Sequence, residues 1–153
     1  AHCLRKLSNF QSLMGIFVGL NLSVCRRMKE MWNGISAAHS QILTELEDVM
    51  SPHNSFKNYR NIMITSAMPL LPYLGVYLSD LTAIDSGNPD RVGAEINFAK
   101  HEMIFRVIEQ IRWYQSTPYQ FPISQPLYNL LHTYCPLTEN QLYALSLWRE
   151  RRK

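Results

Sequence analysis

Apolar residues recur every three or four positions along most of the chain, and this period predicts a succession of helices. The first helix is expected over 7–21, and a second is expected over 24–32 with Ser23 as its cap. Ser36 or Ser40 opens a third helix. The apolar side of this third helix is formed by Ile42, Leu43, Leu46, Val49 and Met50. No segment alternates between apolar and polar residues for long enough to predict a strand, so the expected fold class is all-α.

Prolines and small polar residues divide the remainder of the chain. A turn is expected at 51–55 and a helix over 56–65, and Pro69 and Pro72 then bracket a short extended link. Three later prolines break the chain into a loop, Pro118, Pro122 and Pro126. The short helices that complete the chain are expected over 127–134 and 138–147, the second beginning at Thr138.

The segment that follows the extended link predicts a helix with two unlike faces. Pro72 suits a first helical turn, because its missing N–H would have no partner there, and 87–89 (Gly-Asn-Pro) ends the helix. The apolar face, which should pack on a core, consists of Leu74, Tyr77, Leu78, Leu81 and Ile84. The other face, called here the small-residue face, consists of Gly75, Ser79, Thr82 and Ser86. A solvated helix face normally carries longer charged residues, so this face is suited to close contact with another backbone. Together with a second arm, it predicts a protruding helical hairpin with arms at about 72–85 and 96–115.

Composition describes one well-buried globular domain. The 153 residues are 46% hydrophobic and 18% charged, and the longest apolar runs are too short to span a membrane. The three cysteines cannot all pair internally, which together with the absence of a signal-peptide pattern favours reduced thiols and a cytoplasmic location. The net charge of +3 is concentrated near the C-terminus, so no nucleic-acid partner and no membrane insertion are expected.

Candidate chemistry is sparse. His132 and Cys135, with Cys3 or His2, could be taken for metal ligands, but zinc sites usually use four ligands in paired short spacings. Three acidic residues are better explained by a solvated helix face than by an acid–base pair, Glu45, Glu47 and Asp48. Neither glycine-rich phosphate-binding pattern occurs. We therefore expect no metal, no cofactor and no nucleotide site in this chain.

Several sequence blocks follow one another in a recognisable order. The hairpin carries P-Y-L-G-x-Y-L-x-D-L-T-x-I, then G-N-P, then I-N-F-x-K. Further blocks are L-S-N-F at 7–10, G-L-N at 19–21, M-W at 31–32, F-K-N-Y-R at 56–60, I-E-Q-I at 108–111 with Y-Q at 114–115, and L-S-L at 145–147. Together they resemble the catalytic domain of Ras-type guanine-nucleotide exchange factors, the RasGEF family. The resemblance implies that 1–153 is the C-terminal part of that domain, with its N-terminal helices absent from the chain.

The resemblance also implies a mechanism. In the family, the hairpin inserts beside switch I of a Ras-family small GTPase and opens the nucleotide site. Thr82 occupies the position of a residue that intrudes toward the magnesium site, and Ser86 occupies a position that is usually acidic. Asp85 precedes it but is rotated by about 100° on a helix, so it substitutes poorly unless the helix ends there.

Further residues are expected at the GTPase-binding surface on the same grounds. The residue matching Met14 packs on switch II in the family, and Asn21, Phe56 and Tyr73 match positions around that surface. The remaining expected contacts are Ser79, Asp80, Asn97 and Lys100. Other interpretations stay open, because Asn21 could simply end a helix and the two aromatic residues could belong to the core.

Two functions remain open from the sequence. The first is an exchange factor that promotes GDP release from a Ras-family GTPase without covalent chemistry, and hence not an enzyme in that sense. The second is a catalytically weak relative that binds a GTPase or another signalling protein as a scaffold. The small-residue face through Thr82 favours the first, whereas the neutral Ser86 and the missing N-terminal part of the domain favour the second. The missing N-terminal part of the domain is a further expected partner, and recruitment to a membrane surface would come from other domains or from the GTPase.

Overall fold

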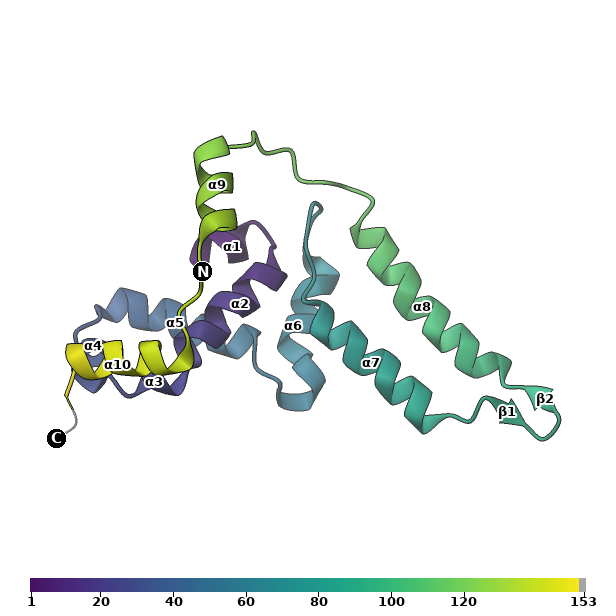
Figure 1. The fold of residues 1–153 in the computed structure, drawn as a ribbon. Helices are drawn as coiled ribbons and strands as arrows, with labels where there is room; N and C mark the ends of the chain where they lie inside the picture. Colours follow the sequence, from purple (N-terminus) through teal and green to yellow (C-terminus); the bar gives the residue numbers. More distant parts are fainter. Residues whose placement is uncertain (152–153) are drawn as a thin grey trace.

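The computed structural model describes residues 1–151, and nearly all of its regular elements are helices (Figure 1), which confirms the all-α class. The helices are α1 His2–Lys6, α2 Phe10–Asn21, α3 Ser23–Arg26, α4 Lys29–Asn33, α5 Ala37–Val49, α6 His53–Thr65, α7 Leu74–Gly87, α8 Phe98–Tyr114, α9 Gln125–Thr133 and α10 Glu139–Arg149. Two strands of two residues each, β1 Arg91–Val92 and β2 Glu95–Ile96, were not predicted. They pair antiparallel, and Gly93 between them has a φ of +64°, which glycine adopts without steric cost.

One apolar core joins the body of the molecule to the base of the hairpin. Its buried side chains come mainly from α2, α5, α6, α7 and α8: Phe10, Leu13, Met14, Leu46, Met50, Tyr59, Met63, Leu70, Val76, Tyr77 and Tyr114. The rings of Phe10 and Tyr59 meet edge to face with centroids 5.3 Å apart. The core therefore fixes the start of the hairpin against α2 and α6.

The hairpin consists of α7 and α8, which pack against each other and extend away from the body, with the two short strands at the far end (Figure 1). Tyr77, Leu81 and Ile84 are spaced by one helical turn and are buried or half-buried. On α8, Ile104, Val107 and the buried Tyr114 occupy comparable positions. The Tyr77 hydroxyl lies 3.3 Å from that of Tyr114, so the two arms are linked at their base.

The expected apolar face of α7 is partly wrong. Leu74 and Leu78 are 40% and 61% exposed, whereas Val76 is buried. Leu78 is rotated by about 100° from Tyr77, so it lies outside the strip that α8 covers.

Three helix boundaries differ from the prediction for local reasons. The first expected helix begins only at α2, because Asn9 caps it by accepting a hydrogen bond from the Ser12 N–H, and Leu7 lies before this cap. Ser23 is the first residue of α3 and not a cap, and the expected helix over 24–32 is divided into α3 and α4. Pro72 precedes α7, which begins after Tyr73.

Two helix caps agree with the prediction, whereas a turn and a proline lie elsewhere than expected. Ser36, and not Ser40, caps α5, and Thr138 caps α10 as expected. The expected turn at 51–55 is shifted, since Asn54, Ser55 and Phe56 all have left-handed backbone angles. Pro126 lies in the first turn of α9 and not in the preceding loop, because a proline at that position loses no helical hydrogen bond.

The C-terminal helices lie against the body to different extents. Arg27 donates a hydrogen bond of 2.8 Å to the carbonyl oxygen of Ser146, which holds α10 beside α3. None of the side chains of α9 is buried. Within residues 1–151, no helix is both long enough and apolar enough to cross a membrane.

Candidate functional site

The small-residue face lies along the outside of α7. Its last three members, Ser79, Thr82 and Ser86, are exposed, while Gly75 is half-buried. The Thr82 hydroxyl donates to the carbonyl oxygen of Leu78 at 2.9 Å, and the Ser86 hydroxyl donates to that of Thr82 at 2.8 Å. Both hydroxyls are thus turned back onto their own helix, which leaves a surface of low relief that another chain could approach closely.

Gly75 leaves room for the side chain of Tyr73. A Cβ atom at this position would lie 2.4 Å from the ring of Tyr73, far inside contact distance. The absence of a side chain lets the ring of Tyr73 fold over the first turn of α7. The ring centroid of Phe56 lies 6.0 Å from that of Tyr73 and 6.5 Å from that of Tyr59. Phe56 and Tyr73 are therefore half-buried members of an aromatic cluster at the base of the hairpin.

The start of α7 is fixed by side chains from other helices. The Tyr73 N–H donates to the Tyr59 hydroxyl at 2.9 Å, and the Leu74 N–H donates to Oε1 of Gln11 at 3.0 Å. These N–H groups have no partner within α7, so side chains of α6 and α2 supply the hydrogen-bond acceptors.

An ion pair adds a second attachment to the body. Arg60 on α6 contacts Asp80 on α7 through two hydrogen bonds of 2.8 and 2.7 Å. Hydrogen bonding to Asp80 raises the pKa of Arg60. The carboxylate of Asp80, which was expected to contact a GTPase, is therefore engaged within the chain.

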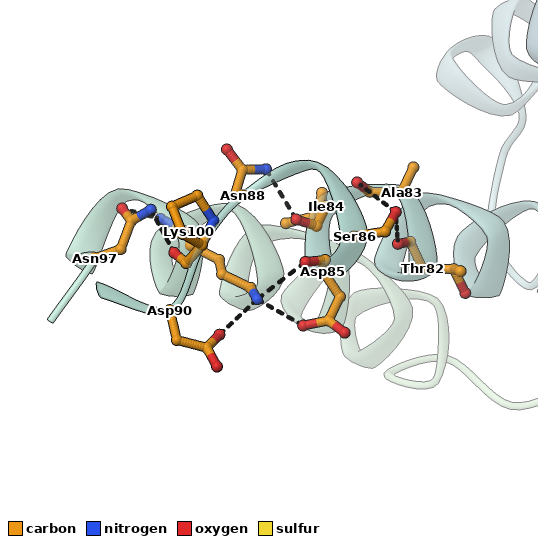
Figure 2. Close-up of polar contacts among 10 residues, drawn as sticks. Thr82, Ala83, Ile84, Asp85, Ser86, Asn88, Asp90, Asn97 and Lys100 are labelled. Atoms are coloured by element: carbon orange, nitrogen blue, oxygen red, sulfur yellow. Dashed lines mark hydrogen bonds and ion pairs between the residues drawn. The ribbon is translucent and has the colours of Figure 1, made fainter. Parts of the chain in front are cut away.

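The far end of the hairpin is organised around Lys100 (Figure 2). Its ammonium lies 2.6 Å from Oδ1 of Asp85 and 2.7 Å from Oδ1 of Asp90, and it donates to the carbonyl oxygen of Asp85 at 3.1 Å. Hydrogen bonds to Asp85 and Asp90 raise the pKa of Lys100, and the hydrogen bond from Lys100 lowers the pKa of Asp90. This three-residue cluster, called here the tip clamp, joins α7, the connection and α8.

Two asparagines support the same region (Figure 2). Asn97 caps α8 by accepting from the Lys100 N–H at 3.2 Å, and its Nδ2 donates to the carbonyl oxygen of Pro89 at 2.8 Å. Asn88 donates to the carbonyl oxygen of Ile84 at 2.8 Å, near the end of α7. The connection between the arms is thus held by hydrogen bonds on both sides.

The two expected contacts on α2 are differently placed. Met14 belongs to the core and is only 8% exposed, so little of its side chain is available to a partner. Asn21 is exposed at the last residue of α2, where it donates to the Phe17 carbonyl oxygen and accepts from Arg26. Asn21 does end a helix, as its simpler interpretation held, and its exposure keeps it open to a partner.

The structure gathers the expected site residues in three places. Thr82, Asp85, Ser86, Asn97 and Lys100 lie toward the far end of the hairpin. Phe56, Tyr73, Ser79 and Asp80 lie at or near its base, and Met14 and Asn21 lie on α2. Sequence analysis missed Arg60, Asp90, Tyr59 and Gln11. The available signal was Asp80, one of two charged residues among the small and apolar residues of α7, which calls for a basic partner.

Within residues 1–151, no three His, Cys, Asp or Glu side chains are gathered as a metal ion would require. The expected absence of metal and nucleotide binding by the chain stays a prediction.

Comparison with known proteins gives the family. The RasGEF domain family model matches residues 1–102. Among similar proteins of Dictyostelium discoideum, "Ras guanine nucleotide exchange factor R" is 42% identical over 151 residues, which cover 98% of this chain and 9% of the relative. Factor S is 39% identical over 94% of this chain and 15% of its own length, and factor K is 40% identical over 97% and 10%. The chain thus spans between 9% and 15% of these relatives, and it belongs to the RasGEF domain family.

Proposed function

We propose that this chain is a guanine-nucleotide exchange factor for a Ras-family small GTPase. The observation that carries the proposal is the exposed small-residue face of α7 on a protruding hairpin, in a chain that belongs to the RasGEF domain family. The names of the relatives, which describe Ras guanine nucleotide exchange factors, support the same class of partner.

The proposed mechanism is displacement. The hairpin places its small-residue face beside switch I of the GTPase and holds the nucleotide site open. The chain then stabilises the nucleotide-free GTPase more than the GDP-bound form, and GDP leaves faster as a result. The hydrogen bonds to Tyr59 and Gln11 and the Arg60–Asp80 ion pair fix α7 to the body, so that the helix keeps its position when it contacts the GTPase.

Electrostatic competition with the phosphates plays a smaller part in this proposal. The Ser86 hydroxyl is neutral and bonded to its own helix, and one carboxylate oxygen of Asp85 is paired with Lys100. These two features also favour the second candidate, a scaffold that binds a GTPase without efficient exchange. The two candidates differ in the rate of GDP release and not in binding.

Release of a fluorescent GDP analogue from several purified Ras-family GTPases, with the full chain added, tests the proposal. At least one GTPase should release GDP faster in its presence. Thr82→Arg should abolish most of this acceleration, because a long charged side chain would keep the two backbones apart. Circular dichroism should show unchanged helicity, since Thr82 is exposed.

Thr44→Arg is the matched control, because Thr44 is an exposed threonine of α5, outside the hairpin, and its hydroxyl likewise donates to the carbonyl oxygen four residues earlier. It should retain most of the activity. Equal activity of the parent and Thr82→Arg would contradict the placement of the small-residue face against the GTPase. Binding of the parent without any acceleration would instead establish the scaffold.

A further inference from the structure

We propose that Lys100 is a positioning residue for nucleotide exchange, which holds the last turn of α7 in place and does not itself contact the GTPase. This inference rests on the proposed function. It differs from the expectation that Lys100 binds the GTPase directly.

The first support is the saturation of its ammonium. Lys100 is only 3% exposed, whereas the side chains of Asp85 and Asp90 are 74% and 81% exposed. An ammonium has three protons, and three oxygens surround it, namely the Asp85 carbonyl, Asp85 Oδ1 and Asp90 Oδ1 (Figure 2). A GTPase could bind this ammonium only by displacing one of them.

The second support is the position of Lys100 on its own helix. It is the third residue of α8, after the Asn97 cap, and a positive charge in a first turn opposes the helix dipole. The same charge lies beside the carbonyl end of α7, where a cation is favourable. Lys100 is therefore unfavourably placed for α8 and favourably placed for α7.

The third support is what the tip clamp connects. Asp85 is in the last turn of α7, whose carbonyl oxygens lack intrahelical donors, and Asp90 is in the connection to β1. The Asn97 N–H donates to the Asp90 carbonyl oxygen at 2.9 Å and so holds the connection from the other side. Ser86 directly follows Asp85, so the position of its side chain depends on this turn remaining closed.

Loss of the tip clamp should therefore affect the end of α7 more than its middle. Thr82 lies one turn earlier, where α7 packs on α8, and the Tyr77–Tyr114 hydrogen bond holds the two arms together at their base. We expect GTPase affinity, carried mostly by the body of the helix, to fall less than the rate of GDP release, which depends on the position of the tip.

Lys100→Met tests the inference, because it keeps an unbranched side chain and removes the charge. Hydrogen exchange followed by mass spectrometry should show at least about fivefold faster deuterium uptake in peptides covering 85–97, and little change in α2 or α5. Arg106→Met is the matched control, since Arg106 lies on the exposed side of α8 in an ion pair with Glu102. It should leave uptake at the tip unchanged.

The kinetic arm uses a GTPase loaded with a fluorescent GDP analogue. Lys100→Met should lower the accelerated release rate by about tenfold, while affinity for the nucleotide-free GTPase falls by less than about threefold. Lys100→Arg should recover most of the rate. Asp90→Asn should slow release in the parent but add little to Lys100→Met, because the two residues act as one unit.

Unchanged uptake at the tip in Lys100→Met would overturn the inference, as would a fall in rate fully matched by a fall in affinity, which would mean direct contact. If the parent chain does not accelerate the release of GDP from the GTPase, the proposed function is contradicted. The uptake measurement, which needs no GTPase, would then still decide whether Lys100 holds the tip.

Discussion

In the proposed mechanism, residues 85 and 86 set how much charge the last turn of α7 can bring to the nucleotide site of the GTPase. Because α7 continues through Gly87, Asp85 remains about 100° away from Ser86 and cannot take its place. Asp85 turns toward Lys100, while the Ser86 hydroxyl turns back along α7 (Figure 2). The sequence alone predicts that Ser86 is neutral, but the pairing of Asp85 with a lysine 15 positions later comes only from the fold.

Ser86→Glu should raise the rate of GDP release by up to about tenfold. A partly screened charge acting over several ångströms near the magnesium site contributes about 1–2 kcal/mol. The added charge near the end of α7 should lower the free energy of unfolding by only about 0.3 kcal/mol.

Ser86→Gln is the control for this substitution, because it has the same length without the charge, and it should not exceed the parent rate. An unchanged or slower rate for Ser86→Glu, with GTPase affinity intact, would mean that charge at this position has no part in release.

At the scale of elements, helix period predicted α7 and α8 but only some of the residues that they bury. Tyr77 is buried and Leu78 is exposed, although both are apolar neighbours. The choice depends on where α8 lies, and no local pattern in α7 contains that information. Caps show the same division: Ser36 and Thr138 act on their own helices and were predictable, whereas Tyr59 and Gln11 act on a helix that begins 15 and 63 residues later in the chain.

Removal of the Tyr59 hydroxyl tests the attachment of α7 to the body. Tyr59→Phe leaves the aromatic packing in place but leaves the Tyr73 N–H without its acceptor. The free energy of unfolding, measured by urea denaturation, should fall by about 1–2 kcal/mol. Tyr128→Phe, at an exposed position of α9, should have no measurable effect. An equal loss in both variants would mean that the hydrogen bond to Tyr73 does not stabilise the chain.

At the scale of the whole molecule, the ordered sequence blocks predicted the family and the protruding hairpin, both of which stand. The attachments that fix the hairpin were not predictable, because each joins residues from separate elements. Arg60 and Asp80 are 20 positions apart, and Tyr77 and Tyr114 are 37 apart. Such pairs appear only once the body and both arms are placed together.

Buried tyrosines should make the stability of the whole molecule fall at alkaline pH. Burial raises the pKa of Tyr59 to about 12 from its ordinary value of 10.0, and burial also raises the pKa of Tyr77. The folded state keeps these protons to higher pH than the unfolded state does. The stabilisation is therefore complete below pH 10 and is lost as pH rises from 10 toward 12.

Urea denaturation across this range should show the free energy of unfolding falling by about 1.4 kcal/mol per pH unit for each such tyrosine. Tyr59→Phe should show a shallower fall, by about one proton, than the parent. Parallel curves for the two proteins would contradict the burial of Tyr59 in the core.

Displacement by the hairpin requires that the chain prefer the open GTPase. The most direct measurement is the affinity of the full chain for one Ras-family GTPase in its nucleotide-free and GDP-bound forms, by biolayer interferometry. The proposed function predicts at least about 100-fold tighter binding to the nucleotide-free form, with the affinity of the GTPase for GDP lowered by the same factor in the complex. Equal affinity for the two forms would contradict it, because a partner that binds both states equally cannot weaken the binding of GDP.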